Sequence, residues 1–225
     1  ILQPQTGNDS MKYNFRGISQ FSSVRNTDTS STLDKLGFKS DGTNLNLRYQ
    51  NNTLLMDSLF GIKYNFSDRN PQKFAFHKLE TQGNQTLYQN EMALSLAFLT
   101  ASPYKDIPFS NLTLDNQKNF LNHLTGQSLS YYQRLHPLKT GADDPSQGPQ
   151  KAKVEADSFL TYASIEYELY IQNDSQLYVN LPSLEFENED YTDVEIITNG
   201  QVNRYTTDNV FPFFTIGHFT AGETV

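Results

Sequence analysis

The densest group of potential metal ligands is an acidic run late in the chain, formed by Glu185, Glu187, Glu189, Asp190 and Asp193. Carboxylate oxygens are ligands that Ca²⁺ prefers, so calcium binding is one interpretation of this run. Glycoside hydrolysis also needs two carboxylates across a cleft, and the acids around Glu187 are the candidates for that chemistry. A solvated turn between strands has the same composition, and residues 185–187 alternate as strand edges do. We favour the turn and assign no metal site.

The remaining side chains suited to catalysis do not form a recognisable set. The histidines His77, His123, His136 and His218 lack metal-ligand spacing, and we expect surface or hydrogen-bonded roles for them. The absence of cysteine excludes disulfides, thiolate metal sites and cysteine nucleophiles. The chain also lacks a nucleophile elbow, a phosphate-binding glycine loop and a dinucleotide fingerprint. We therefore assign no catalytic, cofactor-binding or metal-binding residue.

Tyrosines spread along the chain are candidates for sugar recognition, because an aromatic face packs on the apolar C–H face of a pyranose. The alternative is ordinary strand residues with a buried ring and a hydrated hydroxyl, which we favour for each one taken singly. The tyrosines concerned are Tyr49, Tyr64, Tyr88, Tyr104, Tyr131, Tyr132, Tyr170 and Tyr205.

The charge of the chain excludes two classes of partner. The net charge is −8, and the 17 lysines and arginines are scattered without a stripe. Binding to nucleic acid or to an anionic lipid surface depends on clustered basic residues, so we expect neither.

Helices and strands alternate in the first part of the chain. Three helices are predicted, each followed by a glycine that can end it: residues 30–36 before Gly37, residues 53–60 before Gly61 and residues 115–124 before Gly126. Asp28 or Thr29 is expected to cap the first helix. Alternation of apolar and polar residues predicts strands at residues 62–66, 74–76, 86–88 and 94–100, with a turn at residues 82–84.

The second part of the chain reads as β structure. Residues 139–150 contain almost no apolar side chain and resemble a linker. Strands are predicted at residues 162–171, 176–181, 193–198 and 201–205, and Asn199-Gly200 is a strong hairpin signal. We predict an α+β fold: a mixed α/β domain at residues 1–140, a linker at 141–154, and a jelly-roll-like antiparallel β-sandwich at 155–225 that is cut short.

The chain reads as the water-soluble, outward-facing portion of a longer protein rather than a complete enzyme. No window approaches the roughly 18 consecutive apolar residues of a membrane-spanning helix. The N-terminus has neither an initiator methionine nor a signal-peptide pattern, and the C-terminus stops where a new strand is expected to begin.

Four segments follow one another along the chain in a distinctive order: FRGISQFSS at residues 15–23, DSLFGIKY at 57–64, LYQNEMALSLAF at 87–98 and NQKNFLNHLTG at 116–126. This order resembles the YfhO-like family of bacterial multi-pass membrane proteins. The stretch from residue 155 onward, with GHF at residues 217–219, resembles the start of the β-sandwich that follows in such proteins. The resemblance covers most of the chain.

The resemblance implies a membrane protein with glycosyltransferase-C organisation that uses a polyprenyl-phosphate-linked sugar and decorates lipoteichoic acid or a related cell-envelope polymer. It places this part on the extracytoplasmic face of a Gram-positive cell membrane, with the envelope polymer or its glycan and the rest of the parent protein as partners. The catalytic acid of that class is expected in an early loop that this chain lacks, so no catalytic residue is carried over.

Three hypotheses follow. The chain is an accessory extracytoplasmic domain of a membrane glycosyltransferase, non-catalytic in itself, which positions an acceptor or caps the active site. It is alternatively an envelope-binding or structural ectodomain with no role in glycosyl transfer. The third hypothesis, a free-standing carbohydrate-active enzyme, depends on the acids around Glu187.

Overall fold

The computed structural model describes residues 8–24, 26–38, 46–47, 49, 52–100, 107–110, 112–135, 139–140, 167–180, 192–207 and 213–225. Within these residues the order of elements is α1 (Asp9–Lys12), β1 (Gln20–Phe21), α2 (Thr27–Lys35), β2 (Asn46–Leu47), α3 (Leu54–Leu59), β3 (Tyr64–Ser67), β4 (Phe76–Gln82), β5 (Gln85–Asn90), α4 (Thr113–Thr125), β6 (Lys139–Thr140), β7 (Tyr167–Glu168), β8 (Ser175–Asn180), β9 (Thr192–Thr198), β10 (Gln201–Thr207) and β11 (Phe213–Phe219).

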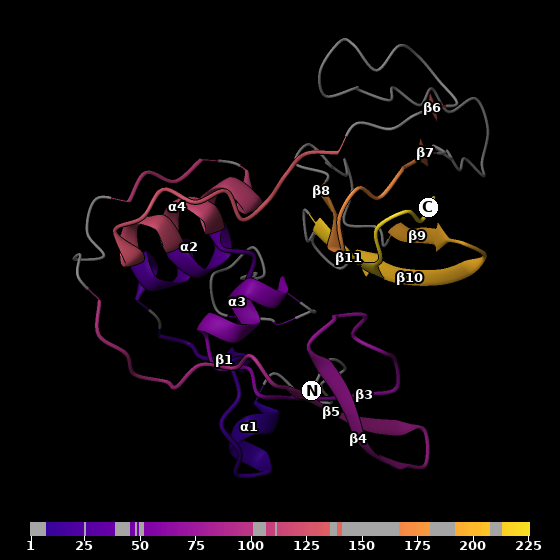
Figure 1. Ribbon diagram of the computed structural model, residues 1–225. Helices are drawn as coiled ribbons and strands as arrows, with labels where there is room; N and C mark the ends of the chain where they lie inside the picture. The colour runs from indigo at the N-terminus through magenta and orange to yellow at the C-terminus, as the bar shows by residue number, and fades with distance from the viewer. Residues whose placement is uncertain are drawn as a thin grey trace, which may run out of the picture.

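Helices combined with antiparallel sheets confirm the predicted α+β class. The largest sheet has the strand order β3-β5-β4, and the other strands form the antiparallel pairs β1-β2, β6-β7, β8-β11 and β9-β10. Figure 1 shows α2, α3 and α4 grouped together, α1 and the β3-β5-β4 sheet below them, and the β8–β11 strands on the other side. The described strands do not close into a barrel, so support for a sandwich is limited to these antiparallel pairs.

The three predicted helices are confirmed, with one error at a cap. Helix α2 is capped by Asn26, whose Oδ1 accepts from the backbone N–H of Thr29 at 2.9 Å, so the predicted cap at Asp28 or Thr29 was wrong. Helix α4 ends at Gly126 in the left-handed region, with φ of 66°. Glycine adopts this conformation without steric cost, which is why it ends helices so often.

The predicted hairpin at Asn199-Gly200 and the predicted turn at residues 82–84 are also confirmed, but the strand expected at residues 74–76 begins only at Phe76. Strands β4 and β5 pair around Gly83, and β9 and β10 pair from Thr198 opposite Gln201 onward. At the second turn Asn199 and Gly200 both have positive φ, 48° and 79°, as a type I′ turn requires.

Two strand predictions were wrong in an informative way. Residues 94–100 alternate in sequence but form no strand, and their backbone runs irregularly from β5 toward α4. In β3 the polar residues Asn65 and Ser67 are buried, whereas Tyr64 is 50% exposed. The strand therefore turns its polar face inward, and Ser67 Oγ accepts from the backbone N–H of Arg69 at 3.0 Å.

The core lies between the helices and the first strands. It consists of buried side chains from the end of α2, from β2, and from α3 and α4: Leu36, Phe38, Leu47, Tyr49, Met56 and Leu121. Phe38 meets Phe60 edge to face, with ring centroids 4.7 Å apart. Because these segments are far apart in sequence, the core ties both ends of the first 125 residues together.

The predicted division into domains stays a prediction, but direct contacts link the two parts. The hydroxyl of Tyr178 in β8 accepts from the backbone N–H of Leu54 in α3 at 3.0 Å. At the chain end Leu169 and Val225 exchange backbone hydrogen bonds, which fastens the last residues beside β7. The predicted acidic run at residues 185–193 lies outside the residues whose side chains are described.

The cap of α2 gives a first test. Asn26→Ala is expected to lower the free energy of unfolding by about 1 kcal/mol, because the N–H of Thr29 loses its acceptor. Asn26→Ser restores a capping oxygen and should keep most of the stability. Urea denaturation measures both variants; equal losses for alanine and serine would contradict a capping role.

Candidate functional site

The strongest concentration of chemistry in the described residues is a buried acid–base cluster, here called the Asp57 cluster, of Asp57, Lys73 and Tyr49. Asp57 comes from α3, Lys73 from the segment that leads into β4, and Tyr49 from the segment after β2. Lys73 Nζ donates to Asp57 Oδ2, and the Tyr49 hydroxyl donates to Asp57 Oδ1 at 2.8 Å. Lys73 Nζ also lies 3.4 Å from the Tyr49 hydroxyl oxygen and 5.2 Å from the centre of the Phe76 ring.

Burial governs the electrostatics of this cluster. The side chains of Asp57 and Lys73 are both 0% exposed. Burial raises the pKa of Asp57, and the nearby Lys73 charge only partly opposes that shift. Burial likewise lowers the pKa of Lys73, against the attraction of Asp57. Burial and then the Asp57 charge raise the pKa of Tyr49 well above its usual value.

These shifts show that taking the two charges out of water costs more than their attraction returns, as is common for buried ion pairs. In the described structure neither side chain is reachable from the surface. The Asp57 cluster is therefore a structural centre, and its chemistry is to hold α3, the strand β4 and the segment around Tyr49 in register.

A second polar network, here called the amide network, lies beside the cluster. Thr53 caps α3 and donates from its hydroxyl to Gln117 Oε1 of α4 at 2.8 Å. Gln117 Nε2 donates to the Leu36 carbonyl at 3.0 Å and to Asn52 Oδ1 at 3.1 Å. The hydroxyl of Tyr132 donates to Gln117 Oε1 at 2.6 Å. Burial within this network raises the pKa of Tyr132.

The amide network reaches the C-terminal strands through Tyr178. The rings of Tyr132 and Tyr178 meet edge to face at 6.1 Å, and the Tyr178 hydroxyl holds the first backbone N–H of α3. Burial raises the pKa of Tyr178 as well. Helix α3 is therefore held at its start by Tyr178 and at its middle by Lys73.

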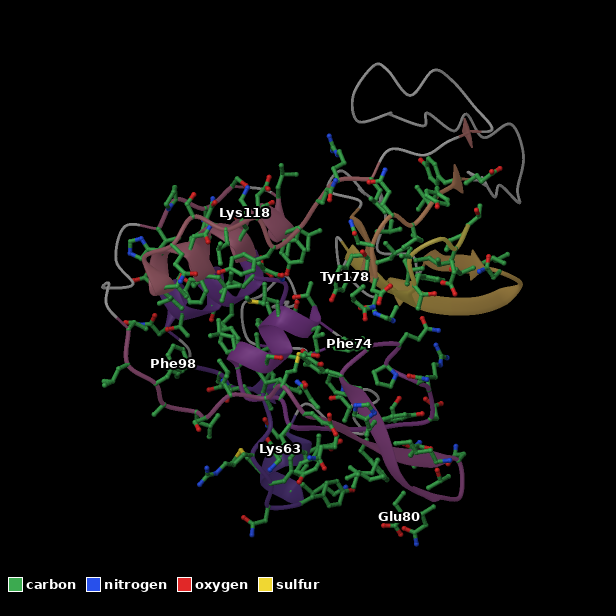
Figure 2. The ribbon with its side chains drawn as sticks, in the orientation of Figure 1. Lys63, Phe74, Glu80, Phe98, Lys118 and Tyr178 are labelled. Carbon is green, nitrogen blue, oxygen red and sulfur yellow. The ribbon has the colours of Figure 1, made fainter. Side chains whose placement is uncertain are left out.

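The exposed surface next to this junction carries an aromatic platform, here called the Phe74 shelf, of Phe74, His218, Gln72 and Gln176. The Phe74 ring is 50% exposed and stacks on the His218 ring at 5.2 Å. Gln176 of β8 accepts from the Phe74 N–H at 3.0 Å and donates to the Gln72 carbonyl at 2.8 Å. Figure 2 shows Phe74 near Tyr178, between the helices and the C-terminal strands.

The Phe74 shelf joins an exposed ring to an imidazole and to the amide of Gln176, whose oxygen and nitrogen are already hydrogen-bonded to the backbone. An aromatic ring beside amide groups is suited to a ligand that is rich in hydroxyls and presents an apolar face, which describes a sugar. Gln72 has φ of 56°, and its N–H donates to Asn70 Oδ1 at 2.8 Å, so a tight turn fixes the segment that carries the ring.

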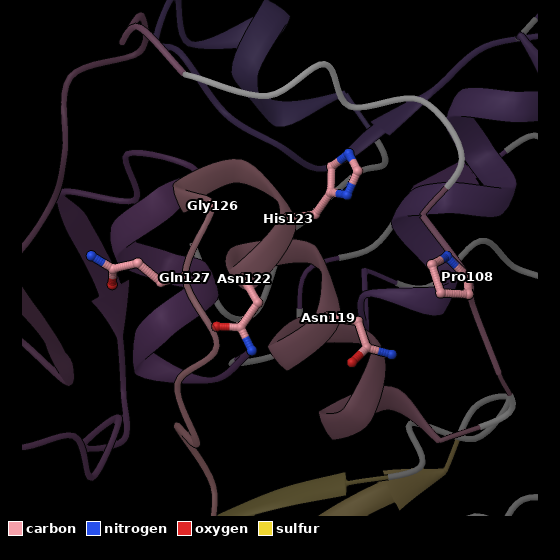
Figure 3. A pocket seen from close by; sticks show the side chains of 6 residues that line it. All are labelled: Pro108, Asn119, Asn122, His123, Gly126 and Gln127. Atoms are coloured by element: carbon pink, nitrogen blue, oxygen red, sulfur yellow. The ribbon is translucent and has the colours of Figure 1, made fainter.

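A second surface feature is an open depression of about 400 Å³ beside α4. Figure 3 shows the residues that line it, most of them from α4 and the turn that follows: Pro108, Asn119, Asn122, His123, Gly126 and Gln127. The amide of Asn122 is already engaged with the backbone of Leu129, through bonds of 2.9 and 3.0 Å. The depression offers less free hydrogen-bonding capacity than its composition suggests.

The tyrosines considered as sugar platforms differ in burial: some are buried in the fold and others are half exposed. Tyr49 is buried in the Asp57 cluster, Tyr132 belongs to the amide network, and Tyr131 packs against the core. Tyr64 and Tyr170 are about half exposed, at 50% and 49%. Tyr88 is half-buried in β5, whereas Tyr104 and the side chain of Tyr205 lie outside the described residues.

The histidines occupy the surface positions expected for two of them. His77 is exposed, and its Nε2 lies 3.3 Å from Glu91 Oε2, while His218 is exposed within the Phe74 shelf. His123 lines the depression beside α4, and His136 lies outside the described residues. In the part of the chain that the structure describes, histidines and acids form no group of three or more able to hold a metal.

Sequence reasoning missed the Asp57 cluster and the Phe74 shelf. A signal for the first was present: Asp57 lies in an otherwise apolar helical stretch, where an acid on the core side needs a buried partner. Nothing local marked Lys73 as that partner. The platform depends on a contact between residues 144 positions apart, which no pattern along the chain encodes.

Comparison with known proteins decides the family. The chain matches the family described as "Bacterial membrane protein YfhO" over residues 1–225. The chain belongs to the YfhO family. Curated proteins and solved structures gave no significant match. Within the described residues of this YfhO chain, no helix combines the length and apolar character needed to cross a bilayer.

The YfhO segments singled out in the sequence coincide with buried polar residues. DSLFGIKY supplies Asp57, and NQKNFLNHLTG supplies Asn116 and Gln117, which are all essentially buried. LYQNEMALSLAF supplies Asn90, whose Nδ2 donates to the Ile62 carbonyl at 3.1 Å. In this YfhO chain these segments therefore share a structural role, because each supplies polar side chains that are buried in the fold.

The structural role of the Asp57 cluster gives the second test. Lys73→Met leaves a buried carboxylate without its cation, and the free energy of unfolding should fall by about 3–5 kcal/mol. The double variant Asp57→Asn, Lys73→Met buries no charge and keeps an acceptor for Tyr49, so it should recover most of that loss.

Urea denaturation of the wild type, both single variants and the double variant gives the coupling between the two residues. Additive losses, with no recovery in the double variant, would contradict the account of the pair.

Proposed function

We propose that this chain is the extracytoplasmic, non-catalytic part of a YfhO-family membrane glycosyltransferase, and that it positions the acceptor polymer. Membership of the family suggests a membrane-associated, glycosyltransferase-like protein. The resemblance described above adds the expected acceptor, which is lipoteichoic acid or a related polymer of a Gram-positive cell envelope. The transfer chemistry then belongs to other parts of the protein.

The observation that carries the non-catalytic assignment is the complete burial of the Asp57 cluster. General acid–base catalysis needs a group within hydrogen-bond reach of the substrate. Asp57 and Lys73 are a buried acid–base pair, and both side chains are 0% exposed. Asp57 and Lys73 are hydrogen-bonded to each other, and both also contact the hydroxyl of Tyr49.

The observation that supports acceptor positioning is the Phe74 shelf. Its ring is exposed, its backbone is held by Gln176, and its neighbours are amides and an imidazole. A polymer that carries sugars presents C–H faces to such a ring. The net charge of −8 disfavours the phosphates of a teichoic acid, so the glycan is the part expected to bind.

Replacing the ring tests this proposal. Phe74→Ala should weaken binding of glycosylated teichoic acid fragments by about threefold to tenfold, which corresponds to the loss of one aromatic contact. Phe21→Ala is a matched control, because Phe21 is comparably exposed at 45% but lies on β1 and outside the shelf. Titration calorimetry measures binding, and thermal melting shows whether each variant is folded.

In cells, the same Phe74→Ala substitution in the full-length protein should reduce the sugar content of the polymer. Absence of fragment binding by the wild-type chain, together with unchanged glycosylation in the variant, would contradict acceptor positioning. That outcome would favour a structural ectodomain with no part in glycosyl transfer.

A further inference from the structure

A row of exposed apolar side chains follows β5 and is separate from every site described above. It consists of Met92, Leu94, Leu96, Phe98 and Leu99 and is here called the Leu99 ridge. Leu99 is fully exposed, Leu96 is 67% exposed, and the other three are each about half exposed. Figure 2 shows Phe98 on the extended segment that runs away from the C-terminal strands. Soluble surfaces carry single apolar residues, but five exposed apolar residues within eight positions of the chain are characteristic of an interaction surface.

The backbone of the ridge is held in place rather than loose. The N–H of Leu94 donates to the Ser58 carbonyl at the end of α3 at 2.9 Å, and the N–H of Met92 donates to Asn90 Oδ1 at 2.9 Å. Leu96 lies so close to Gly61 that a Cβ there would come within 3.0 Å of its Cδ2 atom. The first part of the ridge, from Met92 to Leu96, is therefore anchored to the folded core.

We infer that the Leu99 ridge rests on the surface of a lipid bilayer, with its side chains inserted among the lipids at the interface. The chain belongs to a family of membrane proteins, so a bilayer is the apolar phase expected near it. The inference does not depend on glycan binding or on sugar transfer.

Charge and area favour lipid over a second copy of the chain. Residues 92–100 contain no charged side chain, in a chain with 25 acids, so the ridge is complementary to an uncharged apolar partner. Its exposed apolar area is on the order of 500 Å², which is below the roughly 800 Å² per partner of a stable protein interface. Contact with lipid has no such minimum, because each inserted side chain contributes separately.

The depth of contact follows from the backbone. Residues 94–100 are irregular, and an irregular backbone is not tolerated in the hydrocarbon region of a bilayer. The side chains therefore enter while the backbone stays at headgroup level. The net charge of −8 predicts preference for neutral lipids over anionic ones.

Vesicle flotation tests the inference directly. The 225-residue chain should float with phosphatidylcholine vesicles, and Leu99→Glu should lose most of that flotation without unfolding, because Leu99 is fully exposed. Val24→Glu is the matched control, since Val24 is 85% exposed and lies elsewhere on the surface. The chain contains no tryptophan, so Phe98→Trp supplies a single probe whose emission should shift to the blue on insertion.

Three results would overturn the inference. The first is no flotation and no blue shift with the wild-type ridge. The second is flotation that Leu99→Glu leaves unchanged, or that appears only with anionic lipid. The third is a concentration-dependent dimer in sedimentation that Leu99→Glu dissociates, which would make a second copy the occupant. Loss of glycan binding in Phe74→Ala would leave all of these readouts unchanged.

Discussion

The fold of this chain depends on one buried ion pair, between Asp57 and Lys73. The acid sits in the middle of α3 and the base precedes β4, so the pair connects the helical core to the β3-β5-β4 sheet. Tyr49 satisfies the second carboxylate oxygen at 2.8 Å. A buried pair of this kind contributes little net stability, but removing one partner is costly, and it permits one arrangement of the surrounding elements.

Other features of the structure follow from that constraint. Strand β3 faces Asn65 and Ser67 inward and leaves Tyr64 half exposed. The amide network fixes the start of α3 against α4 through Thr53 and Gln117. Tyr178 then extends the same scaffold to the C-terminal strands, so the position of the Phe74 shelf is determined by polar contacts in the core.

Sequence reasoning predicted the elements whose signals are local. The glycines after α2, α3 and α4 and the Asn199-Gly200 turn are read from one or a few adjacent residues. Sequence reasoning failed where the structure of a segment depends on a contact with residues far away in the chain. Residues 94–100 have the alternation of a strand but no neighbouring strand to pair with, and Lys73 meets Asp57 across 16 positions. The exposed Phe74 ring was interpreted as part of a strand, because its stacking on His218 depends on tertiary structure.

The central claim is that the buried acid and base in this YfhO chain serve architecture, while its exposed surfaces serve recognition. The most direct test is sugar transfer to the envelope polymer by the full-length protein carrying Asp57→Asn with Lys73→Met, normalised to the amount of folded protein in the membrane. The account predicts transfer per folded molecule close to that of the wild type. A variant that folds and inserts normally but transfers no sugar would contradict it, because Asp57 or Lys73 would then take part in the chemistry.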